Sequence, residues 1–125
     1  MPGSVADASI LGAVAFGEPN AEEAVSLLAD AKLYEPTLLA YDLASIARKK
    51  IVGYPGQIES ILRALAAVLG MNVRWMEVDQ FAVVNLALET GLTTYDASYL
   101  YLARHLGVPL LTFDRRLAAF APPQG

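Results

Sequence analysis

The stretch LLTFDRR, residues 110–116, ends a continuous apolar run on an acid, which two arginines follow directly. Apolar runs of this length, bounded by turn residues, are typical of short parallel strands that are buried on both faces. Asp114 therefore falls at the carboxyl end of a strand predicted over 109–113. A carboxylate in that place either caps the helix that follows or belongs to a site.

Outward from this strand, turn and capping signals divide the sequence into short strands that alternate with longer helices. The pattern predicts further strands at 4–7, 32–36 and 73–78, and helices at 9–16, 21–31, 37–50, 57–69, 80–89, 94–105 and 115–121. Such alternation implies an α/β fold, with a parallel sheet covered by helices on both faces. At 125 residues, we expect a single domain over 1–125.

The composition is unusually apolar for a small soluble chain. It is 55% hydrophobic and 18% charged, against a typical charged fraction of about a quarter. Arg63, Asp42 and Asp79 interrupt the long apolar stretches, so none reaches the roughly 18 residues that a membrane span needs. We therefore expect no membrane insertion and some apolar surface in a subunit interface, for which the aliphatic face of 57–69 is a candidate.

The rare residue types limit the chemistry that this chain can perform. It has no cysteine and one histidine, His105, which excludes thiolate metal sites and leaves no basis for a multi-histidine one. The first residues show no secretory signal, so we expect a cytoplasmic protein. If the protein is an enzyme, carboxylates are the expected carriers of its chemistry.

Two aspartates fall on apolar helix faces. Asp42 lies within about 60° of the centre of the stripe that Leu39 and Leu43 form, and Asp96 shares its face with Leu100. Carboxylates that face a core are costly unless something compensates their charge. Asp42, in the middle of its helix, has no simple structural explanation, whereas Asp96 is close enough to a helix start to interact with the helix dipole.

Two further aspartates follow predicted strands. Asp7 and Asp114 each come directly before a predicted helix, so each could simply cap it. The carboxyl ends of parallel strands are also where α/β sheets form their sites. Since bases are few, a divalent cation bound by Asp7, Asp42, Asp96 and Asp114 explains the four acids together. Hard oxygen ligands favour Mg²⁺, Mn²⁺ or Ca²⁺.

The segments VADAS, the acid inside a helix about 35 residues later, and LTTYDASYLYLARHLGVPLLTFDRRL (92–117) together resemble the PIN-domain ribonucleases. Within that family the sequence is most similar to the VapC-type toxins of toxin–antitoxin pairs. The resemblance covers nearly the whole chain, and 92–117 is its most specific part.

The resemblance implies a three-layer PIN-like fold, with a mostly parallel sheet of four to five strands flanked by helices. It implies a Mg²⁺- or Mn²⁺-dependent ribonuclease that hydrolyses RNA phosphodiester bonds. By this resemblance the catalytic, metal-binding positions are Asp7, Asp42, Asp96 and Asp114, and Ser9 and Thr112 orient carboxylates or water. A cognate antitoxin and a homodimeric state are the implied partners.

This sequence departs from the family pattern in two places. Asp42 stands where the family usually has glutamate, so its carboxylate is one methylene shorter. The sequence also lacks the further short strand that many relatives carry after the LLTFD strand. We therefore expect one edge of the sheet to be missing.

The basic residues have two readings each. Arg48 stands with two lysines at the predicted end of the helix over 37–50, where bases suit the helix dipole; alternatively it contacts RNA phosphates. Arg115 and Arg116 lie closer to the acids and are candidates for the same contact.

Two other classes of function compete with a nuclease. One is a PIN-fold module that binds RNA or protein with weak or no catalysis, which the loss of acidic positions would have favoured. The other is a receiver-like signalling domain, which needs an acid pair after the first strand and a lysine after the last. This sequence keeps all four acidic positions and lacks the lysine, so both rank below the ribonuclease.

Overall fold

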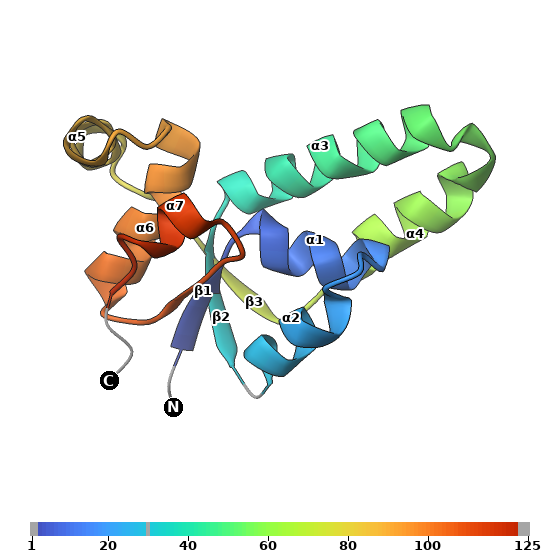
Figure 1. Cartoon of the computed structure of the whole chain (residues 1–125), viewed down its shortest axis with the longest axis horizontal. Helices are drawn as coiled ribbons and strands as arrows, with labels where there is room; N and C mark the ends of the chain where they lie inside the picture. Colours follow the sequence, from blue (N-terminus) through green and yellow to red (C-terminus); the bar gives the residue numbers. More distant parts are fainter. Residues whose placement is uncertain (1–2, 30, 123–125) are drawn as a thin grey trace.

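The computed structural model describes residues 3–29 and 31–122 of the chain. Its centre is one sheet of four parallel strands in the order β3-β2-β1-β4 (Figure 1). The strands are β1 (Gly3–Ala6), β2 (Lys32–Pro36), β3 (Val73–Met76) and β4 (Leu110–Leu111). The α/β class and the parallel sheet are confirmed, and the described residues form no fifth strand.

The helices also follow the predicted order. They are α1 (Ala8–Phe16), α2 (Ala21–Leu28), α3 (Leu38–Gly53), the 3-10 turn η1 (Pro55–Gln57), α4 (Ile58–Leu69), α5 (Gln80–Thr90), α6 (Thr94–Leu106) and α7 (Arg115–Ala118). Asp79 and Thr93 begin α5 and α6 as side-chain caps, and Gly91 and Gly107 end them in the left-handed conformation.

Several predicted boundaries are wrong. α2, β3 and α7 end at Leu28, Met76 and Ala118, two or three residues earlier than predicted. The helix α3 continues to Gly53 instead of ending at Lys50, and it stops there because Tyr54, which precedes Pro55, leaves the helical conformation. The strand β4 is two residues long instead of five. Beyond Leu111 the chain leaves the ladder, since Thr112 and the amide of Phe113 bond to side chains near the end of β1.

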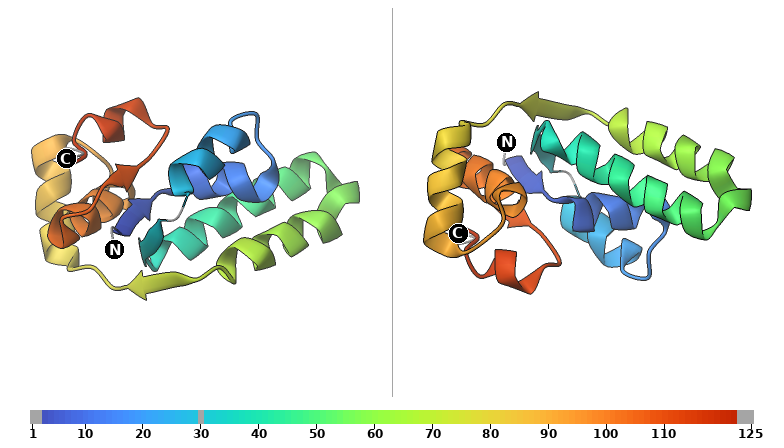
Figure 2. Two further views of the ribbon diagram at one scale, coloured as in Figure 1. Left: turned by 90° about the horizontal axis from the view of Figure 1, so that it is seen from below. Right: turned by 90° about the horizontal axis from the view of Figure 1, so that it is seen from above.

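The helices cover the sheet in two groups. α6 packs on β1, β2 and β4, and α5 packs on the outside of α6. On the other face, α1 and α3 contact β1 and β2, while α2 and α4 pack against α1. Figures 1 and 2 show α3 and α4 as an antiparallel hairpin that extends beyond the sheet, away from α5 and α6. This is the expected three-layer arrangement.

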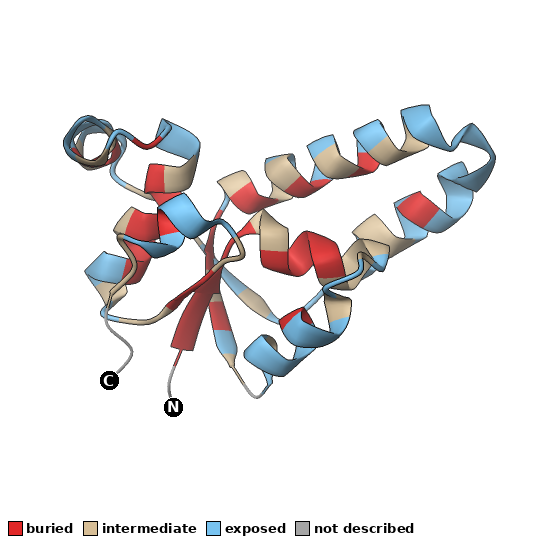
Figure 3. Ribbon diagram, viewed as in Figure 1, coloured by how far each residue is buried: buried red, intermediate tan, exposed pale blue. Residues whose placement is uncertain are grey.

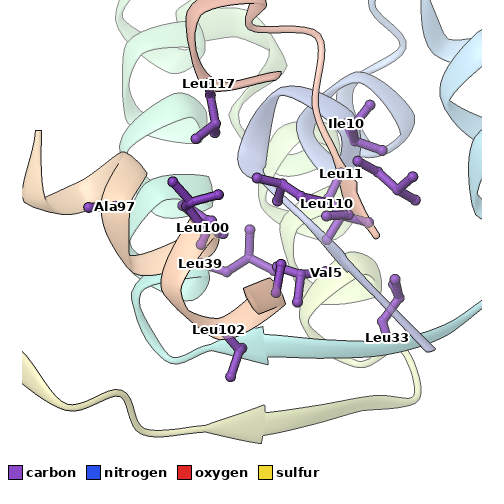
Figure 4. Packing of buried hydrophobic residues seen from close by; sticks show 14 of the residues in the cluster. Val5, Ile10, Leu11, Leu33, Leu39, Ala97, Leu100, Leu102, Leu110 and Leu117 are labelled. Carbon is purple, nitrogen blue, oxygen red and sulfur yellow. The ribbon is translucent and has the colours of Figure 1, made fainter. Parts of the chain in front are cut away.

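The core is centred on β1, whose four residues are all buried (Figure 3). Figure 4 shows Val5 among aliphatic side chains from other elements, including Leu39 of α3 and Leu110 of β4. β1 is a central strand, so its side chains pack against helices on both faces of the sheet. The remaining layers depend on this strand for their shared core.

The strand order also marks where a site is expected. From β1 the chain crosses to β2 and then to β3 on one side, and it returns past β1 to form β4 on the other side. The reversal lies between β1 and β4. In open parallel sheets, ligands bind beyond the carboxyl ends of the strands at such a reversal.

No helix among the described residues is long and apolar enough to cross a membrane. The aliphatic stripe of α4 is largely used within the chain, because Ile61 and Val68 are buried against its neighbours. On α5, by contrast, Phe81 is 87% exposed and Leu88 is 78% exposed. The more open apolar surface thus lies on α5.

The buried layer between α6 and β1 gives a test of the core. Leu100 is fully buried and Val52, on α3, is largely exposed, so Leu100→Ala should lower the free energy of unfolding by about 2–5 kcal/mol through a lost core contact and a cavity. The control change Val52→Ala should alter it by less than about 0.5 kcal/mol. Urea unfolding followed by circular dichroism measures both, and equal effects would contradict the core assignment.

Candidate active site

Asp7 lies at the carboxyl end of β1 and caps α1. Its Oδ1 accepts hydrogen bonds from the Ser9 amide at 3.1 Å and from Ser9 Oγ at 2.5 Å. The side chain is 6% exposed, and this burial raises the pKa of Asp7, while the hydrogen bonds from Ser9 and Thr112 partly offset the rise. Asp7 is thus a helix cap, as one reading of the sequence predicts, and it is also a buried acid.

Thr112 connects the end of β4 to the end of β1. Its Oγ1 donates to Asp7 Oδ2 at 2.6 Å and accepts from the amide of Asp114 at 3.0 Å. The amide of Phe113 donates to Ser9 Oγ at 2.9 Å. The hydroxyls of Ser9 and Thr112 therefore both contact the Asp7 carboxylate, and they bring the segment around Asp114 beside it.

Asp114 is exposed and caps α7. Its Oδ1 accepts from the amides of Arg116 at 2.9 Å and Leu117 at 3.0 Å. The Arg116 guanidinium donates to the carbonyl of Gly91 at 2.6 Å, in the turn between α5 and α6. Arg116 therefore braces α7 against the turn that leads to Asp96, which leaves Arg115 as the exposed base beside the acids.

Asp42 projects from the inward side of α3. The hydroxyl of Tyr99, on α6, donates to Asp42 Oδ2 at 2.6 Å. Burial raises the pKa of Asp42, and the hydrogen bond from Tyr99 lowers it in part. Tyr99 is only 2% exposed, so this contact joins the helices on the two faces of the sheet across its carboxyl edge.

Asp96 occupies the first turn of α6, where its amide donates to the cap residue Thr93 at 3.1 Å. Burial is the largest cause of its raised pKa, and the charges of Asp114, Asp7 and Asp42 raise it further. Four acids from segments far apart in sequence therefore influence one another at one edge of the sheet.

The described residues offer these acids no basic partner. The ion pair present within 3–29 and 31–122 joins Lys50 to Glu18 and involves none of the four aspartates. His105 lies nine residues beyond Asp96 on α6, about 14 Å along the helix, so it cannot serve as a base there. The negative charge of the cluster is instead suited to a cation.

The donor set fits a hard divalent cation in chemistry, because it consists of carboxylate and hydroxyl oxygens. Its spacing fits less well. In the described ranges, no three side chains of the His, Cys, Asp and Glu types are arranged to hold one ion. Hydrogen bonds to Ser9, Thr112 and Tyr99 hold two of the carboxylates in their present places. An ion would therefore have to draw the acids together.

Glu35 is a buried acid of this region that the sequence analysis did not single out. It lies at the end of β2, is 0% exposed, and accepts the amide hydrogen of Ala6 on Oε2 at 2.8 Å. Burial raises its pKa well above the usual range, and the charge of Asp7 adds to the rise. The strand alternation could have revealed it, since Glu35 shares the face of Leu33, which is buried.

Arg48 lies on the exposed side of α3, one and a half turns beyond Asp42. With its neighbour Lys49 it stands more than one turn before the helix end at Gly53, so the predicted interaction of these bases with the helix terminus is weaker than expected. Lys50 is engaged with Glu18. Of the three bases singled out in the sequence, Arg115 is the one beside the acids that no described hydrogen bond holds.

The raised pKa values predict how stability depends on pH. Asp7, Glu35, Asp42 and Asp96 each hold their proton more tightly in the folded state than in the unfolded state. Their contribution to stability is therefore fully present below the unfolded-state values, near pH 4, and is lost as pH rises through the folded-state values. In metal-free buffer the thermal midpoint should decrease as the pH is raised from mildly acidic values to pH 8. The midpoint of the double variant Glu35→Gln, Asp96→Asn should decrease less steeply with pH, and parallel curves for the two proteins would contradict this assignment.

Comparison with known proteins identifies the family. The model of the PIN domain family matches residues 4–122. Ribonuclease VapC3 of Pyrobaculum aerophilum is 32% identical to this chain, over 94% of this chain and 94% of the relative. Exonuclease VapC9 of the same organism matches a shorter segment, with 54% identity over 30% of this chain and 28% of the relative.

Solved structures agree with this comparison. The protein PAE2754 of Pyrobaculum aerophilum superposes with a TM-score of 0.77 at 28% identity, covering 95% of this chain and 84% of that one. The toxin VapC20 of Mycobacterium tuberculosis, described as cleaving the sarcin–ricin loop, shares the fold with a TM-score of 0.71 at 15% identity, over 93% of both chains. With its parallel sheet, its acids at the carboxyl edge and a family match over 4–122, this chain belongs to the PIN-domain family.

Proposed function

We propose that this protein is a metal-dependent endoribonuclease and the toxin of a VapBC-type toxin–antitoxin pair. The observation that carries the proposal is the gathering of Asp7, Asp42, Asp96 and Asp114 at the sheet reversal without a basic partner among the described residues. The 32% identity to Ribonuclease VapC3 over 94% of the chain supports the substrate class. We expect the protein to act in the cytoplasm as a single domain.

The chain's own residues account for much of the required chemistry. The four aspartates would hold Mg²⁺ or Mn²⁺, which supplies a Lewis acid and lowers the pKa of bound water. Ser9 and Thr112 hold the Asp7 carboxylate in one orientation. Arg115, exposed next to Asp114, would contact a phosphate of the RNA.

A cognate antitoxin is the proposed protein partner. A hollow of about 430 Å³ lies between α1 and α3, and its lining includes Ser9, which donates a hydrogen bond to Asp7. Its lining combines apolar side chains such as Ile46 with Lys49 and with the ion pair of Lys50 and Glu18. A partner segment that carries both apolar and acidic side chains would complement this lining.

Metal-dependent cleavage is the first test of the function. Purified protein should cut RNA with Mg²⁺ or Mn²⁺ and stop when EDTA is added. Asp7→Asn and Asp96→Asn should each lower the rate by about 100-fold or more, since each removes a carboxylate that would hold the ion, and the ion stabilises charge on the phosphate. Glu89→Gln, on an exposed part of α5, is the control. Full activity in EDTA would refute the mechanism, and RNA binding without cleavage on several substrates would favour a binding module.

Two substitutions test the role of Asp42: one lengthens its side chain and the other removes its charge. Asp42→Glu supplies the length that is usual at this position and should retain or raise activity. Asp42→Asn keeps an acceptor for the buried Tyr99 hydroxyl, which Asp42→Ala would leave unpaired at a cost to the fold. Addition of Mg²⁺ should raise the thermal midpoint less in Asp42→Asn than in the wild type. An equal gain would show that Asp42 is not a ligand.

Self-association is expected from the apolar composition, and we propose α5 as the surface through which two copies associate. Phe81, Val84 and Leu88 lie along one exposed side of α5, and burying such side chains is favourable. Light scattering should give a dimer rather than the 13.4 kDa monomer. Phe81→Ser with Leu88→Ser should shift it to a monomer, and Ile58→Ser with Leu62→Ser on α4 is the matched control. A wild-type monomer at micromolar concentration would contradict the prediction.

A further inference from the structure

The sheet separates at the carboxyl end of β1. β1 pairs with β2 only through Gly3 and Ser4, and then with β4 through Val5 and Ala6. β2 meanwhile stays paired with β3 to its last residue, Pro36. The two central strands therefore part just before Asp7, at the point where the acidic cluster begins.

This separation leaves one backbone amide of β1 without a ladder partner. The Val5 amide donates to the carbonyl of Pro109, just before β4, at 3.0 Å, and the Asp7 amide donates to the carbonyl of Leu111, in β4, at 3.1 Å. Because successive amides of a strand point to alternate sides, the Ala6 amide points toward β2. Continuing the register of Ser4 with Leu33, Ala6 stands opposite Glu35.

Glu35 fills the place of the missing ladder partner with its side chain. Its Oε2 accepts the Ala6 amide at 2.8 Å, and both groups are fully buried. An apolar side chain here would leave that amide unpaired, which is costly in the interior. Its other oxygen, Oε1, is buried without a hydrogen-bond partner among the described residues. The carboxyl thus supplies one acceptor that the Ala6 amide needs and also carries one buried oxygen without a partner among the described residues.

We propose that Glu35 is a positioning residue of the active site: by accepting the Ala6 amide it fixes the end of β1 and thereby the direction of the Asp7 carboxylate. The Ala6 amide is held from the β2 side and the Asp7 amide from the β4 side, so the backbone that carries Asp7 is fixed on both sides. The role of Glu35 in metal binding rests on the proposed function, whereas its hold on β1 does not.

Three substitutions separate the possible roles of this side chain. Glu35→Gln keeps an acceptor of the same reach and removes the charge. Glu35→Asp keeps the charge and shortens the reach, and Glu35→Met keeps the approximate size without an acceptor. The two readouts are hydrogen exchange of the Ala6 amide, followed by NMR on ¹⁵N-labelled protein, and Mn²⁺ affinity, measured by calorimetry without RNA.

Positioning predicts that Glu35→Gln stays within about twofold of the wild type in both readouts. Glu35→Met and Glu35→Asp should exchange the Ala6 amide about tenfold faster and bind Mn²⁺ about tenfold more weakly, as expected for one lost buried hydrogen bond. Circular dichroism confirms that each variant is folded at the temperature used. If Glu35→Met does not fold, the comparison of Glu35→Asp with Glu35→Gln decides.

The contrary outcomes are distinct. Equal behaviour of Glu35→Gln and Glu35→Met would show that Glu35 only fills space. Mn²⁺ affinity kept by Glu35→Asp and lost by Glu35→Gln would show that its charge acts on the ion directly. Either result overturns the positioning role. If the wild type takes up no Mn²⁺, the proposed function fails, and exchange of the Ala6 amide alone then decides whether Glu35 holds β1.

Discussion

The hydrogen bond from Thr112 to Asp7 is the constraint on which the candidate site depends. It joins residues 105 apart in sequence, at 2.6 Å. It forms just after the short strand β4 has ended, where the chain is no longer paired in the sheet. The same hydroxyl accepts the Asp114 amide, so one threonine sets the places of two acids. Without it, this segment would be held at the end of β1 by the two paired residues of β4 and by the hydrogen bond from the Phe113 amide to Ser9.

The fold tolerates so much negative charge at one edge because helices begin there. Asp7 caps α1, Asp114 caps α7, and Asp96 lies in the first turn of α6. The amide groups at helix N-termini carry partial positive charge and favour carboxylates. This compensation comes from the backbone rather than from bases, so among the described residues it leaves the carboxylates without a basic side chain as partner. It is incomplete, since burial still raises the pKa of Asp7 and of Asp96.

The sequence predicted the elements well because most of their signals are local. Caps such as Asp79 and Thr93, and glycines such as Gly91, define helix ends by the geometry of single residues. The end of β4 could not be predicted in this way. It is decided by hydrogen bonds to Asp7 and Ser9, and no local pattern encodes those contacts.

The site was predictable in part for the same reason. Asp42 was noticeable because it interrupts an apolar stripe, but its partner Tyr99 lies 57 residues away and could not be inferred from spacing. Alternation in β2 places Glu35 on the buried face of Leu33, but it does not show that the side chain accepts the Ala6 amide, 29 residues away. The importance of Glu35 follows from the separation of β1 from β2, which is a property of the assembled sheet.

The central place of β1 has a consequence for folding. Its neighbours β2 and β4 come from opposite sides in sequence, and its pairing with residues 110–111 closes a loop of more than a hundred residues. Closing so long a loop costs chain entropy before any contact repays it, so this step is intrinsically slow. During synthesis, Thr112 and Asp114 cannot take their places beside Asp7 until residues 110–116 have left the ribosome. A nascent chain therefore lacks the complete group of four aspartates, so the cleavage of RNA that we propose has to wait until nearly the whole domain has been made.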